Sequence, residues 1–81
     1  MDVIIEFIGL QKDIVKADKI SLPWKEKMLA RDALDYLEKR YPALPFDRTS
    51  LLPTVNHEVT TLDRPLKPDD IVCFLPHIGG G

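Results

Sequence analysis

The stretch Ala30-Arg31-Asp32-Ala33-Leu34-Asp35-Tyr36-Leu37-Glu38-Lys39-Arg40, followed by Tyr41-Pro42, determines the class of fold. Small and apolar residues recur in it at helical spacing, and charged residues fall between them, which is the pattern of an amphipathic helix of about three turns. The basic residues at its end suit the helix dipole, and Pro42 cannot continue a helix, so we expect it to end near Arg40. No Ser, Thr, Asp or Asn stands before it as an N-cap, so its first residue is not marked.

Short runs of β-branched and aromatic residues lie on both sides of this helix. They predict strands, two before the helix and three after it, at 3–8, 20–22, 51–55, 59–62 and 71–75. The polar stretch 11–19 predicts a loose turn that joins the first two strands as an antiparallel hairpin. Pro53 weakens the third strand or places it at a sheet edge, and Asn56-His57 suits the turn that follows it.

A hairpin, one helix and further strands predict an α+β fold, with a mixed four- to five-stranded sheet and one main helix packed on one face. Alternation along the first and last strands assigns five residues to the core face: Val3, Ile5, Phe7, Val72 and Phe74. The opposite face then also carries apolar side chains, namely Ile4, Ile8, Ile71, Cys73 and Leu75. Either a partner covers part of this open face, or the assignment of faces is wrong, or loop residues such as Trp24 cover it.

Length and composition restrict the class of function. A chain of 81 residues is one domain that buries only about 60–65% of its unfolded surface, which leaves no room for a deep pocket. Its 11 basic and 13 acidic side chains are interleaved, which disfavours nucleic acid and membrane as partners. Cys73 is the single cysteine, and the sequence has neither a signal segment nor an 18-residue apolar run, so we expect a cytoplasmic protein.

After Pro76 the sequence reads His77-Ile78-Gly79-Gly80-Gly81. We expect a folded domain at 1–76 and a flexible glycine-rich tail at 77–81. The glycines are not a phosphate loop, because no helix and no Lys-Ser/Thr follow them. They are either an incidental linker or a tail built to pass through a narrow enzyme channel, since only residues without side chains pass there without clashes. Extended, the five residues reach roughly 16–18 Å.

At this point the sequence resembles the MoaD/ThiS family of sulfur carriers, which includes the small subunit of molybdopterin synthase. The resemblance covers nearly the whole chain, and four segments carry it in order: Asp35–Leu44 as the helix and its exit, Val55-Asn56-His57-Glu58 as a Val-Asn-x-Glu turn, Pro65–Asp70 before the last strand, and Pro76–Gly81 as the Gly-Gly ending. The resemblance implies a ubiquitin-like β-grasp fold.

The resemblance also implies a function. An ATP-dependent activating enzyme adenylates the C-terminal glycine, a sulfur donor converts the adenylate to a thiocarboxylate, and a partner such as the large synthase subunit uses the sulfur. Gly81 would be the sulfur acceptor and Gly79 and Gly80 the residues that thread the channel. The partner interface would comprise Leu75, Pro76, His77 and Ile78. Such a protein is a cosubstrate rather than an enzyme and binds no cofactor, because ATP is used by the activating partner.

Three residues depart from the family pattern. Asp69 stands where the family typically has glycine, which predicts a different turn geometry, because Asp tolerates the left-handed conformation less well. His77 replaces a second proline and Gly79 replaces a small Ser or Ala. Sulfur transfer in another pathway, such as thiamine thiazole synthesis, therefore stays open. So do a ubiquitin-like modifier joined to proteins through Gly81 and an interaction module whose glycines are incidental.

The reactive side chains favour structural roles. Cys73 lies mid-strand without a basic neighbour to stabilise a thiolate, so we expect a structural or weakly exposed thiol. His57 and His77 lack nearby ligands for a metal ion. Asp69 and Asp70 are adjacent, which suits a turn better than an acid/base pair. The sequence therefore predicts no metal site and no intrinsic catalysis.

Overall fold

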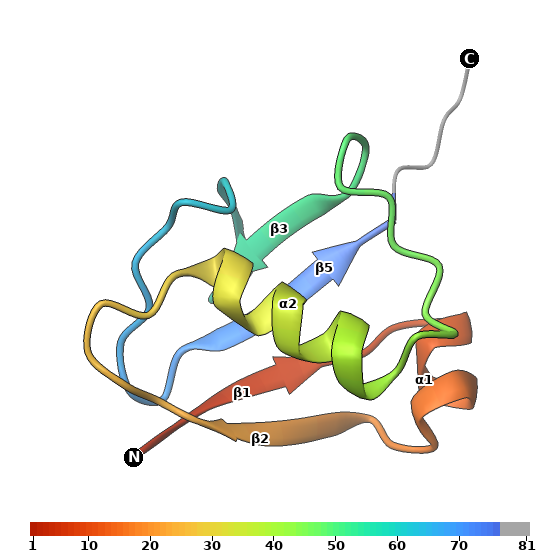
Figure 1. The fold of residues 1–81 in the computed structure, drawn as a ribbon, viewed down its shortest axis with the longest axis horizontal. Helices are drawn as coiled ribbons and strands as arrows, with labels where there is room; N and C mark the ends of the chain where they lie inside the picture. Colours follow the sequence, from red (N-terminus) through yellow and green to blue (C-terminus); the bar gives the residue numbers. More distant parts are fainter. Residues whose placement is uncertain (77–81) are drawn as a thin grey trace.

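The computed structural model describes residues 1–76. Its elements in chain order are β1 (Asp2–Glu6), α1 (Leu10–Val15), β2 (Lys19–Pro23), α2 (Ala30–Arg40), β3 (Leu52–Val55), β4 (Glu58–Val59) and β5 (Ile71–Leu75). The strands form one five-stranded sheet in the order β2-β1-β5-β3-β4, and α2 lies across one of its faces (Figure 1). β1 and β5 pair in parallel, and the other neighbours are antiparallel. The predicted α+β architecture is confirmed. The division into a domain at 1–76 and a tail at 77–81 stays a prediction.

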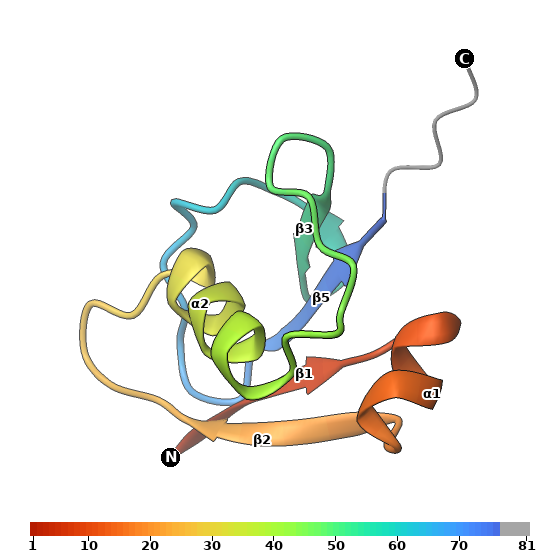
Figure 2. The same ribbon diagram turned by 45° about the vertical axis from the view of Figure 1, so that its right-hand side comes forward.

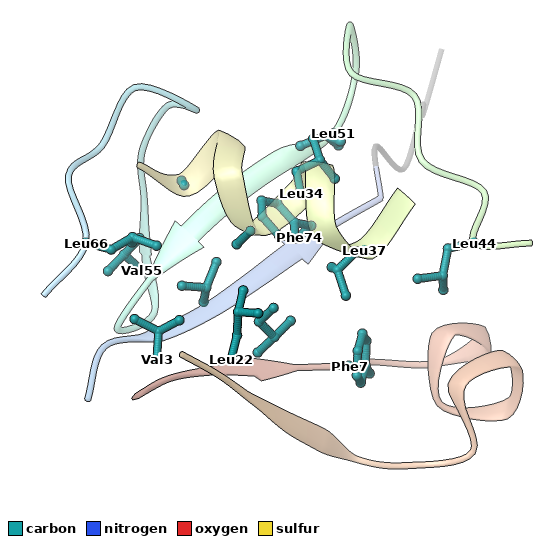
Figure 3. Close-up of a cluster of buried hydrophobic side chains, with 14 of the residues drawn as sticks. Val3, Phe7, Leu22, Leu34, Leu37, Leu44, Leu51, Val55, Leu66 and Phe74 are labelled. Atoms are coloured by element: carbon teal, nitrogen blue, oxygen red, sulfur yellow. The ribbon is translucent and has the colours of Figure 1, made fainter. Parts of the chain in front are cut away.

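The core lies between α2 and the sheet (Figure 3). The five residues that alternation assigned to the core face are all buried, which confirms the facing of β1 and β5. Leu34 and Leu37 of α2 are fully buried against them. Trp24 packs against this same core, and its indole Nε1 donates a hydrogen bond to the Leu66 carbonyl at 2.8 Å. Trp24 is therefore held on the helix side and does not cover the open face. Neither helix of residues 1–76 has the length and apolarity needed to span a membrane.

The first turn of α2 is capped mainly by the chain that follows β4. The N–H groups of Ala30 and Arg31 donate to the carbonyls of Arg64 and Leu62, both at 2.9 Å. Asp32 accepts a hydrogen bond from the N–H of Leu29 at 2.8 Å, which is one half of a capping box. These contacts satisfy the free N–H groups of the helix without a polar N-cap residue, which explains why the sequence does not mark the start.

The connection between β1 and β2 is not the loose turn that the sequence predicts. It contains the six-residue helix α1, which stands at the end of the β1–β2 hairpin (Figure 2). Gln11 and Val15, one turn apart, are buried, and Lys16 ends the helix in the left-handed conformation at φ 66°. The helix is too short, and one of its inward residues is too polar, for a clear periodic signal.

Pro53 does not place β3 at the sheet edge, because β3 lies between β5 and β4. The carbonyl of Pro53 accepts a hydrogen bond from Thr60 at 2.9 Å, on the side away from β5. The N and O atoms of one strand residue point to the same side, so the missing N–H of Pro53 also faces away from β5. The pairing of β3 with β5 therefore loses no hydrogen bond.

The predicted turn at Asn56-His57 is confirmed, and both residues have positive φ, 51° and 70°. This is the pattern of a two-residue hairpin turn that favours Asn-Gly. We expect the substitution His57→Gly to raise the free energy of unfolding by about 0.5–1 kcal/mol, because glycine adopts positive φ without a Cβ clash. Urea denaturation followed by circular dichroism measures the change. His57→Ala is the control, because it removes the imidazole and keeps the Cβ. An equal gain in both variants would mean that the backbone conformation is not the cause.

Candidate partner interface and exit of the last strand

β5 lies in the middle of the sheet, between β1 and β3, and leads directly to the tail. Of the predicted interface, Leu75 is half-buried on the open face and Pro76 is exposed. The other predicted site residues lie outside the described part of the chain: His77, Ile78, Gly79, Gly80 and Gly81. The structure thus places the root of the tail at one end of the central strand (Figure 1).

The face of the sheet opposite α2 is the open face, and it carries an apolar patch. Strand pairing sets Leu52 opposite Leu75 and Val59 opposite Thr54, so these residues share the face with the apolar residues of β1 and β5. We call this set the open-face patch: Ile4, Ile8, Leu52, Val59, Ile71 and Leu75. Ile8, Leu52 and Val59 are 38%, 41% and 64% exposed. Figure 2 shows α2 on the other face, so α2 does not cover this patch.

Two hollows adjoin the root of the tail. One, of about 310 Å³, lies in the open face and is lined by Glu6, Phe7, Ile8, Thr54, His57, Cys73 and Leu75. The second, of about 240 Å³, is lined by Ile8, Gly9, Leu10, Gln11, Pro45, Phe46 and Pro76. Ile8 borders both hollows, and Leu10 beside the second is 63% exposed. Ile8 and Leu10 therefore place exposed apolar surface at the hollow that Pro76 lines.

Cys73 is a buried thiol, as the sequence predicts. Burial raises its pKa, and the negative charge of Glu6 raises it further. Both effects keep the sulfur protonated at neutral pH, and a protonated thiol is a poor nucleophile. Cys73 is therefore poorly suited to act as a sulfur relay.

Two segments that carry the family resemblance are joined at the start of β5. The side-chain amide of Asn56 donates to Asp70 Oδ1 at 3.0 Å, and its oxygen accepts from the N–H of Ile71 at 2.9 Å. Asp70 Oδ2 also accepts from the N–H of Lys67 at 2.8 Å. Asn56 thus links the turn after β3 to the turn before β5. The prediction that Asp70 is a turn residue is confirmed.

The turn at Asp69 does not depart in geometry as the sequence predicts. Asp69 has φ 72°, in the left-handed region that glycine adopts without steric cost. Its N–H donates to the carbonyl of Asp2 at 2.7 Å. Asp is one of the few residue types other than glycine that enter this region occasionally, and the hydrogen bond to Asp2 holds it there. The turn therefore keeps a glycine-like conformation with aspartate in place.

The described residues form no group of three or more His, Cys, Asp or Glu side chains that could hold a metal ion. His57 is exposed at the rim of the open-face hollow. Beside the root of the tail, the described residues present an exposed apolar surface.

Sequence reasoning missed four residues of this region. Leu52 and Val59 belong to short strands whose facing could be assigned only after the register with β5 was known. Leu10 and Gln11 belong to α1, which lies largely within the stretch 11–19 that predicts a loose turn. The one available signal was the spacing of Gln11, Ile14 and Val15, which suits one face of a helix.

The model of the ThiS family matches residues 5–81. No curated protein sequence matches the chain. The structure resembles SAMP1 from Haloferax volcanii with a TM-score of 0.80 and 18% identity, over 100% of both chains. It resembles a putative molybdopterin converting factor, subunit 1, from Pyrococcus furiosus with a TM-score of 0.80 and 19% identity, over 96% of this chain and 99% of that one.

A third similar structure is a protein–protein complex of subunits 1 and 2 of the molybdopterin-converting factor from Helicobacter pylori. Its TM-score is 0.67 at 20% identity, over 100% of both chains. At these identities the structural matches establish the fold, which is the ubiquitin-like β-grasp that the resemblance implied.

Proposed function

The chain belongs to the ThiS family, and from this premise we propose that it is a sulfur carrier for molybdopterin biosynthesis that works through the carboxyl group of Gly81. Members of the ThiS/MoaD and SAMP groups are small carrier proteins rather than enzymes. The observation that carries the proposal is the family match over residues 5–81, which includes the Gly-Gly ending. We propose that the chain is a cosubstrate of other enzymes and acts in the cytoplasm, where ATP is present.

The proposed chemistry needs no reactive side chain of the carrier. The carboxylate of Gly81 attacks the α-phosphorus of ATP in the activating enzyme, and pyrophosphate leaves. Hydrosulfide then attacks the carbonyl carbon of the acyl adenylate, AMP leaves, and a thiocarboxylate remains. Adenylation is needed because a carboxylate has no good leaving group. Gly79 and Gly80 would let the chain pass through the channel to the nucleotide without side-chain clashes.

The proposed partner in sulfur delivery is a large synthase subunit. The Helicobacter pylori structure is a complex of two molybdopterin-converting factor subunits, and its subunits include a chain of this fold. In the present chain the open-face patch supports such a partner, because it is apolar and exposed beside the root of the tail. Leu75 and Pro76 would lie within the contact, together with His77 and Ile78.

A second candidate function is protein modification. SAMP1 from Haloferax volcanii is a small archaeal modifier protein, and it is as similar to this structure as the molybdopterin-converting factor subunit is. An adenylate at Gly81 could equally be passed to a lysine of a target protein. The two functions share the first step and differ in the acceptor.

Intact-protein mass spectrometry tests the proposal after incubation with ATP, sulfide and the cognate activating enzyme. We expect a gain of about 16 Da at Gly81, because sulfur replaces one carboxylate oxygen while the enzyme supplies the activation. The activating enzyme must first be shown to work on an established carrier. Adenylation without sulfur transfer, together with adducts to lysine in cells, would favour the modifier. No adenylation at all by a competent enzyme would refute both functions.

A further inference from the structure

Two polar side chains are buried in the described part of the chain, and both bind main-chain carbonyl groups of β5. Gln11 of α1 is 6% exposed, and its Nε2 donates to the carbonyl of Phe74 at 2.9 Å. Thr54 of β3 is 5% exposed, and its Oγ1 donates to the carbonyl of Cys73 at 3.0 Å. Buried polar side chains are costly unless they are bonded, so both contacts hold these side chains firmly in place.

Beyond the end of β1, the side chain of Gln11 makes a hydrogen bond to β5 of the kind that a neighbouring strand would make. The parallel pairing of β1 with β5 ends with Glu6 opposite Cys73. The next carbonyl, that of Phe74, is bonded by Gln11 Nε2, and Gln11 Oε1 accepts from the N–H of Ile8 at 3.1 Å. The side-chain amide of Gln11 thus links the main chain after β1, at Ile8, to the main chain of β5, at Phe74. This link lies one residue of β5 beyond the last β1–β5 pair.

This bridge fixes the peptide group through which β5 leads to the tail. The carbonyl of Phe74 and the N–H of Leu75 belong to one planar trans peptide and point to opposite sides. Gln11 holds the carbonyl from one side, and Leu75 is paired with Leu52 of β3 on the other. Pro76 follows at once, and its ring restricts the backbone further. The direction of the chain at Pro76 is therefore set from both sides of the strand.

We propose that Gln11 is a positioning residue that sets the direction in which the chain leaves β5, and so presents the residues after Pro76 to the enzyme that acts on them. The inference rests on the proposed function, in which that enzyme adenylates Gly81. Gln11 touches no reacting atom. It acts by holding the Phe74–Leu75 peptide in place. Through Gln11, α1 therefore helps to set the direction in which the chain leaves β5.

Thr54 provides the matched control. It too is buried and donates to a carbonyl of β5, but that carbonyl belongs to Cys73, which is flanked by β1 and β3 on both sides. Loss of the Thr54 hydroxyl leaves those main-chain pairs in place. Gln11→Met and Thr54→Val each keep the approximate volume and remove one buried hydrogen-bond donor to a carbonyl of β5. Gln11→Met also removes the acceptor for the N–H of Ile8, which is the other end of the bridge that holds the exit of β5.

The first measurement is the rate of pyrophosphate release by the activating enzyme as a function of carrier concentration. Each variant is assayed at a temperature at which circular dichroism shows it to be folded. We expect Gln11→Met to raise KM roughly fivefold to tenfold and to leave kcat within about twofold, because a tail aimed in many directions enters the channel less often. Thr54→Val should leave KM unchanged. Equal KM values for Gln11→Met and wild type, or equal increases in both variants, would overturn the proposal.

The second measurement does not depend on the activating enzyme. Hydrogen exchange of the Leu75 amide, followed by NMR, should be faster in Gln11→Met than in wild type and unchanged in Thr54→Val. If the wild-type chain is not adenylated, the proposed function fails, and the exchange of Leu75 still decides whether Gln11 holds the exit. An unchanged exchange rate in Gln11→Met would refute the positioning role.

Discussion

Deletion of Gly80 and Gly81 is expected to abolish adenylation and to leave the fold intact. The shortened chain ends about 7 Å earlier when extended, so its carboxylate cannot reach the nucleotide in a channel shaped for the full tail. Loss of this placement should reduce the adenylation rate by about three orders of magnitude or more. The buried core lies between Val3 and Phe74, so we expect the free energy of unfolding to change by less than about 0.5 kcal/mol.

Pyrophosphate release with the activating enzyme measures the first effect, and urea denaturation measures the second. A chain with one alanine added after Gly81 is the matched control, because it keeps every residue and moves only the carboxylate. It should also be a poor substrate. Wild-type adenylation of the shortened chain would show that the carboxyl group of Gly81 is not the reacting group.

The substitution Leu75→Glu is expected to weaken binding of the large synthase subunit by about 2–4 kcal/mol, or roughly 30-fold to 1,000-fold in Kd. Leu75 lies at the end of β5 on the open-face patch and is half-buried before any partner binds. A carboxylate at this position would lose its bound water when an apolar partner surface covers it. This desolvation costs free energy, and an apolar surface offers no hydrogen bond that compensates for it. Isothermal titration calorimetry measures the dissociation constant.

Tyr36→Glu is the matched control for this substitution. Tyr36 is 36% exposed and lies on α2, which covers the opposite face of the sheet, so the same change of charge falls away from the open-face patch. We expect its Kd to stay within about twofold of wild type. Equal losses in Leu75→Glu and Tyr36→Glu would point to net charge rather than to a contact, and an unchanged Kd for Leu75→Glu would remove the open face from the interface.

The open-face patch could be recognised from the sequence only in part. Ile4, Ile8 and Leu75 alternate with core residues in strands that the sequence marks clearly, so their facing was predictable. Leu52 and Val59 were not, because β3 and β4 are short and contain or adjoin turn residues. Their facing depends on the register of β3 with β5, and register is a property of two paired strands.

Elements with strong local signals are specified by the sequence without any tertiary information. The helical spacing of apolar residues from Ala30 to Arg40 specifies α2, and Pro42 prevents the helix from continuing. The alternation of side chains along β1 and β5 specifies which of them face the core. These signals act within a few residues of the chain, so they can be interpreted without knowing what packs against what. The order of the elements, and with it the fold class, followed from them.

The way in which the end of β5 is held depends on tertiary contacts that no local pattern shows. α1 forms because Gln11 and Val15 become buried against the rest of the chain, and Gln11 finds its hydrogen-bond partner 63 residues away, at Phe74. In the same way, Asp69 keeps a glycine-like turn because its N–H reaches the carbonyl of Asp2. Local propensity alone secures neither feature. Contacts between distant segments stabilise both, because a buried polar group must be bonded wherever its partner lies in the sequence.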